Sequence, residues 1–166
     1  MRGASDALQN EAVPALKQME PSFEGAFAYG FFGVYPGLIM AQTLAAADRR
    51  QEALTLVTRL LDQRSTPEEG IFVSELWRLR GELLLRQSAD NAPDAESCLG
   101  KAARIARDQG AVAYLLRAAT SLARLLVEEG RRQEARTVLK NVAFDRPAEW
   151  EGPEFAAADK LRSDLN

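Results

Sequence analysis

Apolar residues recur at helical spacing along most of the chain, and short polar stretches interrupt them at regular intervals. Residues 122–140 read LARLLVEEGRRQEARTVLK: an apolar run stops at Gly130, four polar residues follow, and a second run begins at Ala135. Apolar positions three and four residues apart form one face of an α-helix, so this stretch predicts two helices joined by a tight turn. Gly130 suits the helix C-terminus, where a left-handed backbone is needed.

The same pattern occurs three times, which makes it a repeating unit. The three stretches are MAQTLAAADRRQEALTLVTRLL (40–61), LRGELLLRQSADNAPDAESCLGKAARIA (79–106) and SLARLLVEEGRRQEARTVLKNVA (121–143). In each, an apolar helix meets a polar break, and a charged step leads to an alanine: Ala53, Ala95 and Ala135, which are 42 and 40 residues apart. Small residues are needed where the two helices of a hairpin cross closely. The chain therefore predicts stacked helical hairpins.

With 166 residues, the chain has the length of one domain. We expect a single all-α domain over residues 1–166. Its parts are an incomplete repeat helix over 4–20, helical hairpins over 33–63, 72–108 and 112–143, and a capping helix over 153–166. An array that opens half-way through a repeat leaves an apolar face that needs cover. A homodimer that covers this face with a second copy is one expected arrangement.

The composition excludes several kinds of functional site. The net charge is −3, and the chain has no histidine and a single cysteine, Cys98. Disulfide frameworks, Cys/His zinc sites and acid–base catalysis by histidine are therefore excluded within the chain. A single cysteine suits a reducing cytoplasm, which is the compartment we expect. The negative charge does not favour nucleic acid or anionic lipid as a partner.

One stretch raises a membrane alternative. Residues 25–47 carry no charge over 23 positions, a length that could span a bilayer. Four glycines, Pro36 near the middle and Gln42 argue against insertion. We therefore favour a buried helix that follows a glycine-rich turn.

No catalytic constellation is present. Gly100 and Lys101 lack the preceding glycines that a phosphate-binding loop requires. Cys98 has no histidine to activate it and lies in an amphipathic pattern, so we expect a small buried residue rather than a nucleophile. We expect no catalytic, cofactor-binding or metal-ligating residue and no cofactor, and therefore not an enzyme.

The repeating unit resembles the tetratricopeptide repeat, a helix–turn–helix unit of about 34 residues. The positions that carry the resemblance are Trp77, Gly81, Leu122, Ala123, Gly130, Ala135 and Pro147. Longer loops at STPEEG (65–70) and RDQGAVA (107–113) lengthen the spacing here. The resemblance implies a right-handed superhelix of antiparallel helical hairpins whose first helices line a concave face.

A longer resemblance covers roughly residues 33–143. ELWRLRGELLLRQ and DAESCLGKAARIARDQGAVAYLLRAATSLARLLVEEGRRQEARTVL look like the C-terminal repeat region of large bacterial signalling ATPases, which carry adenylate-cyclase or DNA-binding regulator domains. It implies a non-catalytic protein–protein interaction scaffold or sensory module in signal transduction. Two alternatives stay open: a small-molecule sensor with its pocket in the aromatic and glycine stretch 23–37, and a C-terminal fragment of such a multidomain regulator.

The tetratricopeptide resemblance, carried over position by position, places ten residues in the candidate interaction groove. They are Tyr35, Leu38, Gln42, Glu75, Arg78, Glu82, Arg86, Arg117, Thr120 and Arg124. The four arginines could form a basic strip for an acidic peptide or a C-terminal carboxylate, because guanidinium pairs bidentately with carboxylate. The alternative, which we favour, is a solvated helix face on which Arg78 and Glu82 pair at i,i+4. The expected partner is a protein or peptide, with no nucleic acid and no membrane.

Overall fold

The computed structural model describes residues 10–19, 34–62, 70, 72–142 and 152–165, and every regular element in these ranges is helical. A first helix covers 10–19. The other elements are α2 (Val34–Ala46), α3 (Arg50–Asp62), α4 (Val73–Gln87), the 3-10 turn η1 (Ala89–Asn91), α5 (Ala92–Asp108), α6 (Val112–Glu128), α7 (Arg132–Asn141) and α8 (Pro153–Leu165). The expected all-helical fold is confirmed for the described part of the chain.

Some sequence predictions lie outside these ranges. Pro147 and the aromatic residues of 23–33 are among them. Of the charge-free stretch 25–47, the described part forms α2, which is 13 residues long. Among the described helices, none is both long enough and apolar enough to cross a membrane.

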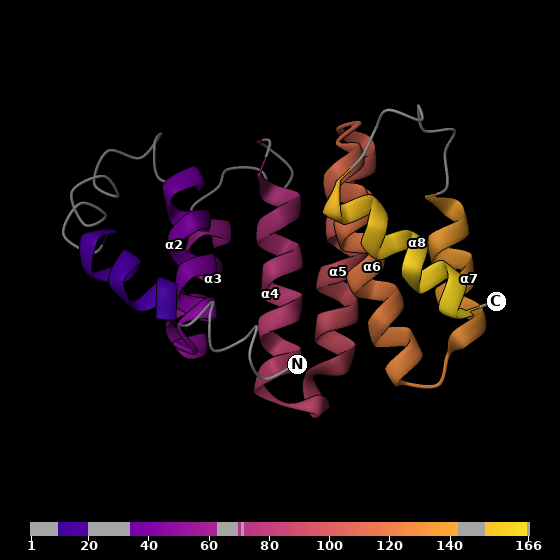
Figure 1. Cartoon of the computed structure of the whole chain (residues 1–166), viewed down its shortest axis with the longest axis horizontal. Helices are drawn as coiled ribbons and strands as arrows, with labels where there is room; N and C mark the ends of the chain where they lie inside the picture. Colours follow the sequence, from indigo (N-terminus) through magenta and orange to yellow (C-terminus); the bar gives the residue numbers. More distant parts are fainter. Residues whose placement is uncertain (1–9, 20–33, 63–69, 71, 143–151, 166) are drawn as a thin grey trace.

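The helices form three consecutive hairpins, α2/α3, α4/α5 and α6/α7, which stand side by side in a row (Figure 1). The first helices of successive hairpins touch, because α2 contacts α4 and α4 contacts α6. Over the described residues, the backbones of the second helices α3, α5 and α7 do not contact one another. A side-chain pair links the last two at one end, between Arg131, just before α7, and Glu96 of α5 at 2.7 Å. The stack therefore has one continuous face of first helices.

The turns explain why the helices stop where they do. Asp48 after α2, Gly110 after α5 and Gly130 after α6 have positive φ angles of 64°, 64° and 79°. In all three turns the next N–H donates to the carbonyl five residues earlier at 2.7–2.9 Å, which closes the helix end. The left-handed conformation expected at Gly130 is confirmed. Asp48 adopts it without the freedom of glycine.

Small residues set the distance between paired helices. The repeat alanines Ala53, Ala95 and Ala135 are all 0% exposed. At Gly81 of α4, a Cβ atom would lie 2.9 Å from Leu99 Cγ and 3.1 Å from the carbonyl oxygen of Ala95, both on α5. The backbones of α4 and α5 can approach this closely only because position 81 has no side chain.

The helix over 10–19 packs on the start of the stack. Its Ala12 and Leu16 are buried, and Leu16 belongs to the core that also contains residues of α2, α3 and α4. These two side chains are covered by the chain itself. The homodimer expected at this end stays a prediction.

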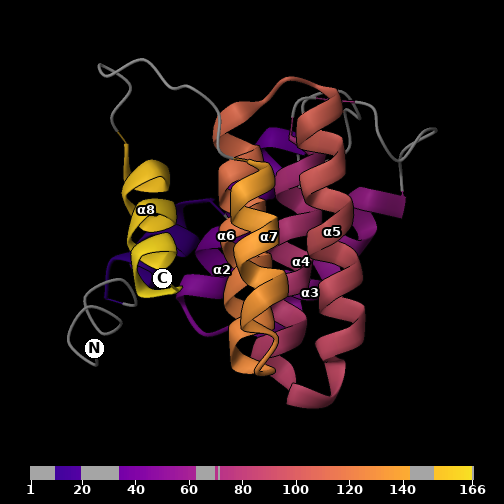
Figure 2. The same cartoon turned by 90° about the vertical axis from the view of Figure 1, so that its right-hand side faces the viewer.

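The last helix, α8, does not extend the row. It packs against α6 and α7, and Figure 2 shows it on the side of the stack opposite α5. Its apolar residues Leu161 and Leu165 join a small core with Ala123 and Leu126 of α6 and Leu139 of α7. The C-terminal helix therefore lies beside the face of first helices that the sequence singled out.

Candidate functional site: the cavity between α4, α6 and α8

Charged residues face one another across α4 and α6. On α4, Glu75, Arg78 and Glu82 are three and four residues apart, and on α6 Arg117 and Ser121 are four apart. Residues at these spacings share one helix face. Since α4 and α6 are in contact, the two faces meet along the row of first helices.

Arg78 is the centre of the resulting network. Its guanidinium donates from Nε to Glu75 Oε1 at 3.0 Å, from Nη2 to Glu75 Oε2 at 3.2 Å, and from Nη1 to Glu82 Oε1 at 2.5 Å. Arg117 of α6 pairs with Glu75 Oε2 at 3.0 Å. Glu82 Oε1 also accepts from Ser121 Oγ at 2.7 Å. Two inter-helix contacts of this network thus join the first helices of the second and third hairpins.

Burial makes this network costly to disrupt. Glu75 is 1% exposed and Arg78 is 8% exposed. Burial alone lowers the pKa of the Arg78 guanidinium, but the carboxylates of Glu82 and Glu75 outweigh it, so the pKa of Arg78 is raised overall. A buried charge left with no partner costs about 3–5 kcal/mol, and Arg78 avoids this cost because two carboxylates, Glu75 and Glu82, pair with it. The network fixes how α4 and α6 lie against each other.

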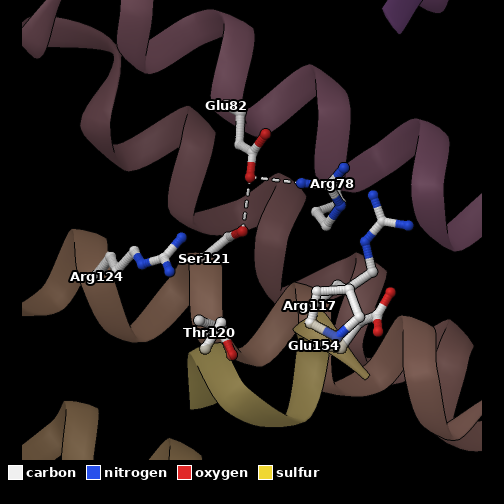
Figure 3. Close-up of a pocket in the computed structure, with 9 residues that line it drawn as sticks. Arg78, Glu82, Arg117, Thr120, Ser121, Arg124 and Glu154 are labelled. Carbon is white, nitrogen blue, oxygen red and sulfur yellow. Dashed lines mark hydrogen bonds and ion pairs between the residues drawn. The ribbon is translucent and has the colours of Figure 1, made fainter. Parts of the chain in front are cut away.

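A cavity of about 340 Å³ opens beside the network (Figure 3). Its lining comes from three helices: Arg78 and Glu82 of α4, Arg117, Thr120, Ser121 and Arg124 of α6, and Pro153, Glu154 and Ala157 of α8. The volume is within the range of small ligand pockets and of anchor pockets for one or two side chains. The α8 residues belong to its first turns, so α8 forms one wall of the cavity.

Two charged side chains of the lining are available for a ligand. Within the described residues, Arg124 and Glu154 make no ion pair, whereas Arg78, Glu82 and Arg117 are paired. Figure 3 shows Arg124 and Glu154 on opposite sides of the cavity. The cavity therefore offers one cation and one anion rather than a strip of positive charge.

Thr120 adds an unsatisfied polar group. Its side chain is 4% exposed, and its Oγ1 has no hydrogen-bond partner. Thr43, Thr55 and Thr137 each donate to the carbonyl four residues earlier, at 2.8–3.0 Å, which is the usual solution within a helix. Thr120 does not. A buried hydroxyl without a partner is unfavourable by about 1–3 kcal/mol, so a ligand that brings a hydrogen-bonding group to Thr120 removes this cost.

The ten residues expected in the groove do not form one surface in the structure. Five of them line the cavity: Arg78, Glu82, Arg117, Thr120 and Arg124. Glu75 lies beneath them in the network, and Leu38 is a core residue at 4% exposed. Tyr35 is exposed, Gln42 is half-buried, and Arg86 is exposed near the C-terminal end of α4.

The basic strip is therefore not available as such. Arg78 and Arg117 are both engaged by acidic residues. The Arg78–Glu82 pair of the alternative interpretation is present, but the solvated face that it expected is wrong at Glu75 and Arg78, which are buried where α4 meets α6. The periodicity indicated the correct helix face but gave no information on which charges meet across two helices.

Four lining residues were not expected from the sequence. Ser121 is adjacent to Thr120, and its spacing to Arg117 is a signal that could have found it. Pro153, Glu154 and Ala157 belong to α8, and nothing in the local pattern indicated that this helix turns back onto α6.

A second feature of the same face is aromatic. The ring centroid of Tyr35 at the start of α2 lies 4.9 Å from that of Phe72, just before α4. Phe72 in turn lies 6.4 Å from Tyr114, at the start of α6. Burial is the main cause of a raised pKa at Tyr114. These rings join the same ends of the three first helices and leave Tyr35 54% exposed.

Two other features of the described residues bear on a functional site, the single cysteine and possible metal ligands. Cys98 is buried, and burial raises the pKa of its thiol, so the neutral and less reactive form is favoured. Among the described residues, no group of three or more acidic or cysteine side chains could hold a metal ion. Neither feature competes with the cavity as the candidate site.

The chain matches no family model and no curated protein. The cavity and the network are therefore interpreted from their own geometry.

Proposed function

We propose that the chain is a non-catalytic protein-interaction module, a tetratricopeptide-like right-handed stack that binds a partner on the face of α2, α4 and α6. The setting we propose is cytoplasmic signal transduction, following the resemblance of residues 33–143 to the repeat regions of bacterial signalling ATPases. Support for the binding face comes from the cavity at the α4–α6 junction, where Arg124 and the hydroxyl of Thr120, both on α6, lack partners among the described residues.

The recognition chemistry follows from the charges. Arg78, Glu75, Glu82 and Arg117 satisfy one another and serve as a rigid base. Arg124 is left to pair with an acidic group of the partner, and a charged hydrogen bond of this kind contributes about 1.5–3 kcal/mol. The partner is thus a protein segment that brings a carboxylate to Arg124 and apolar side chains to the neighbouring surface.

The test is selection of peptides from a display library on the full chain, followed by mapping of the selected peptides by amide chemical shifts. We expect shifts at residues 117–124 of α6 and a loss of affinity of about tenfold or more in Arg124→Ala. Arg107→Ala is the matched control, because Arg107 is an exposed arginine on α5, on the other side of the stack. The proposal fails if no peptide is selected, or if the shifts map to α3 and α5.

A further inference from the structure

The position of α8 defines what kind of segment this face accepts. We propose that the surface beneath α8 is a binding site for an α-helix of a partner protein, and that α8 occupies it until the partner displaces it. This inference rests on the proposed function and specifies its partner as a helix with the side-chain pattern of α8. The first argument for a helix-binding site is that a helix, α8, occupies this surface in the structure.

The contacts of α8 follow one helical stripe. Glu154 lies at the cavity, and Ala158, Leu161 and Leu165 follow at intervals of four, three and four residues. Ala158 and Leu165 are 1% and 2% exposed, and Leu161 packs beside Leu165. Spacing of this kind is how an amphipathic helix lies in a groove. An acidic residue in the first turn also suits the positive end of the helix dipole.

The surface that receives this stripe belongs to α6 and α7. Ala123, Leu126 and Leu139 form the apolar part, and all three are nearly fully buried in the core that they share with Leu161 and Leu165 of α8. Small residues on these helices let another helix lie close to their backbones. The surface accepts a helix better than an extended strand, since the hydrogen-bonding groups of a helical backbone are already satisfied within the helix.

The end of α8 is held through its backbone. Arg132 donates to the carbonyl of Asp164 at 3.0 Å, and Arg136 donates to the carbonyl of Leu165. These carbonyls are the unpaired acceptors that any helix has at its C-terminus. The two arginines therefore recognise the end of a helix independently of its side chains, so a partner helix of similar length can use the same contacts.

The fit of α8 is also incomplete. Only two of its 13 residues are buried. Thr120 Oγ1, in the wall that α8 completes, and Arg162 Nε on α8 itself are both buried without a partner. Figure 3 shows Thr120 beside the first turn of α8. A partner helix with a polar group at this point satisfies the hydroxyl and gains over α8.

The chain between α7 and α8 is long enough to permit exchange. Eleven residues, 142–152, separate Asn141 from Pro153. At full extension they span about 36–40 Å. This length lets α8 leave the surface while it stays attached to the chain, so a partner helix competes with a covalently linked one.

The experiment uses the full chain and one defined probe, a fluorescent, N-acetylated peptide with the sequence of residues 152–165. Leu161→Asp on α8 weakens docking of the helix in cis and leaves the α6–α7 surface unchanged. Ser163→Asp is the matched control, because it adds the same charge at an exposed position of α8. We expect the peptide to bind Leu161→Asp at least tenfold more tightly than the wild type or Ser163→Asp, which corresponds to a helix docked about 90% of the time in the wild type.

Specificity is tested with the peptide itself. A probe that carries Leu161→Asp should not bind any of the three chains. The inference is overturned if Leu161→Asp, with its helical circular dichroism retained, binds the unmodified probe no better than the wild type.

A second measurement covers the case in which Leu161→Asp does not fold. A protease site is placed within residues 143–151 of the full chain, and the folded protein is cut there. We expect the released helix to exchange with the labelled peptide, and retention of the original helix without exchange would overturn the inference.

The outcomes separate this inference from the proposed function. Library peptides that bind the face as extended chains, with no gain in helical circular dichroism, overturn the helix-binding site and leave the proposed function standing. Failure to select any peptide, combined with binding of the α8 probe to Leu161→Asp, overturns the proposed function and leaves the helix-binding site standing.

Discussion

Because α4 and α5 approach closely at Gly81, packing decides whether Gly81→Ala raises or lowers the free energy of unfolding. In an exposed helix interior, replacing glycine with alanine stabilises by about 1 kcal/mol, because the alanine backbone loses less entropy on folding. At Gly81 the new Cβ would lie 2.9 Å from Leu99 Cγ and 3.1 Å from the carbonyl oxygen of Ala95. The carbonyl is backbone and cannot rotate away, so the two helices have to separate. We expect Gly81→Ala to be neutral or destabilising by up to about 2 kcal/mol, since overpacking costs about 1–3 kcal/mol.

Gly100 on α5 is the matched control. It also lies inside a helix, and a Cβ there would meet nothing within 4 Å. Gly100→Ala should therefore gain the full helix-propensity term of about 1 kcal/mol. Both substitutions are identical in chemistry, so the difference between the two free energies of unfolding isolates the packing at Gly81, at about 1–3 kcal/mol.

The assay is urea unfolding followed by far-ultraviolet circular dichroism, with the slope of the transition compared between variants. In thermal unfolding, the two variants should differ in Tm by about 3–10 °C. Equal stabilisation by Gly81→Ala and Gly100→Ala would refute the close approach of α4 and α5.

Three further results are expected. Asp48→Gly should raise the free energy of unfolding by about 1 kcal/mol, because Asp48 has a φ of 64° that favours glycine; a fall in Tm by calorimetry would contradict this. Glu75→Gln should lower it by about 1.5–3 kcal/mol in urea unfolding, since Arg78 and Arg117 lose a charged partner while Arg78 keeps Glu82, and a loss under about 1 kcal/mol would show that Glu75 is dispensable. The Arg131 hydrogen bond lowers the pKa of the Glu134 carboxyl from its ordinary value of 4.5, so its contribution to stability is present above pH 4.5 and is lost as pH falls through the lowered pKa. Glu134→Gln should flatten the pH dependence of stability below that point and change little at pH 7, and an unchanged acid limb in pH-jump unfolding would count against it.

Much of the fold could be predicted because its determinants are local. The period of apolar residues indicated helices, Gly130 indicated a left-handed turn, and the alanines at 53, 95 and 135 indicated the crossing points. Each of these signals lies within a few residues of the feature it specifies.

The site could be predicted only in part, because its contacts join distant residues. Glu75 and Arg117 are 42 positions apart, and their pairing depends on the separation and rotation of α4 relative to α6. Helical periodicity places each residue on a face but does not say which charge it will meet. The sequence indicated a capping helix over 153–166 but not where it packs. Its few apolar residues do not identify the helices that they contact.

The most direct test of the binding face is site-specific photo-crosslinking in cells that express the full chain. A photoreactive amino acid is placed at position 124, on the face of first helices, or at position 107, on α5. If the proposed face binds a partner, position 124 should yield a discrete crosslinked species and position 107 should not. Crosslinking of the same species from position 107, with none from position 124, would contradict the proposed face.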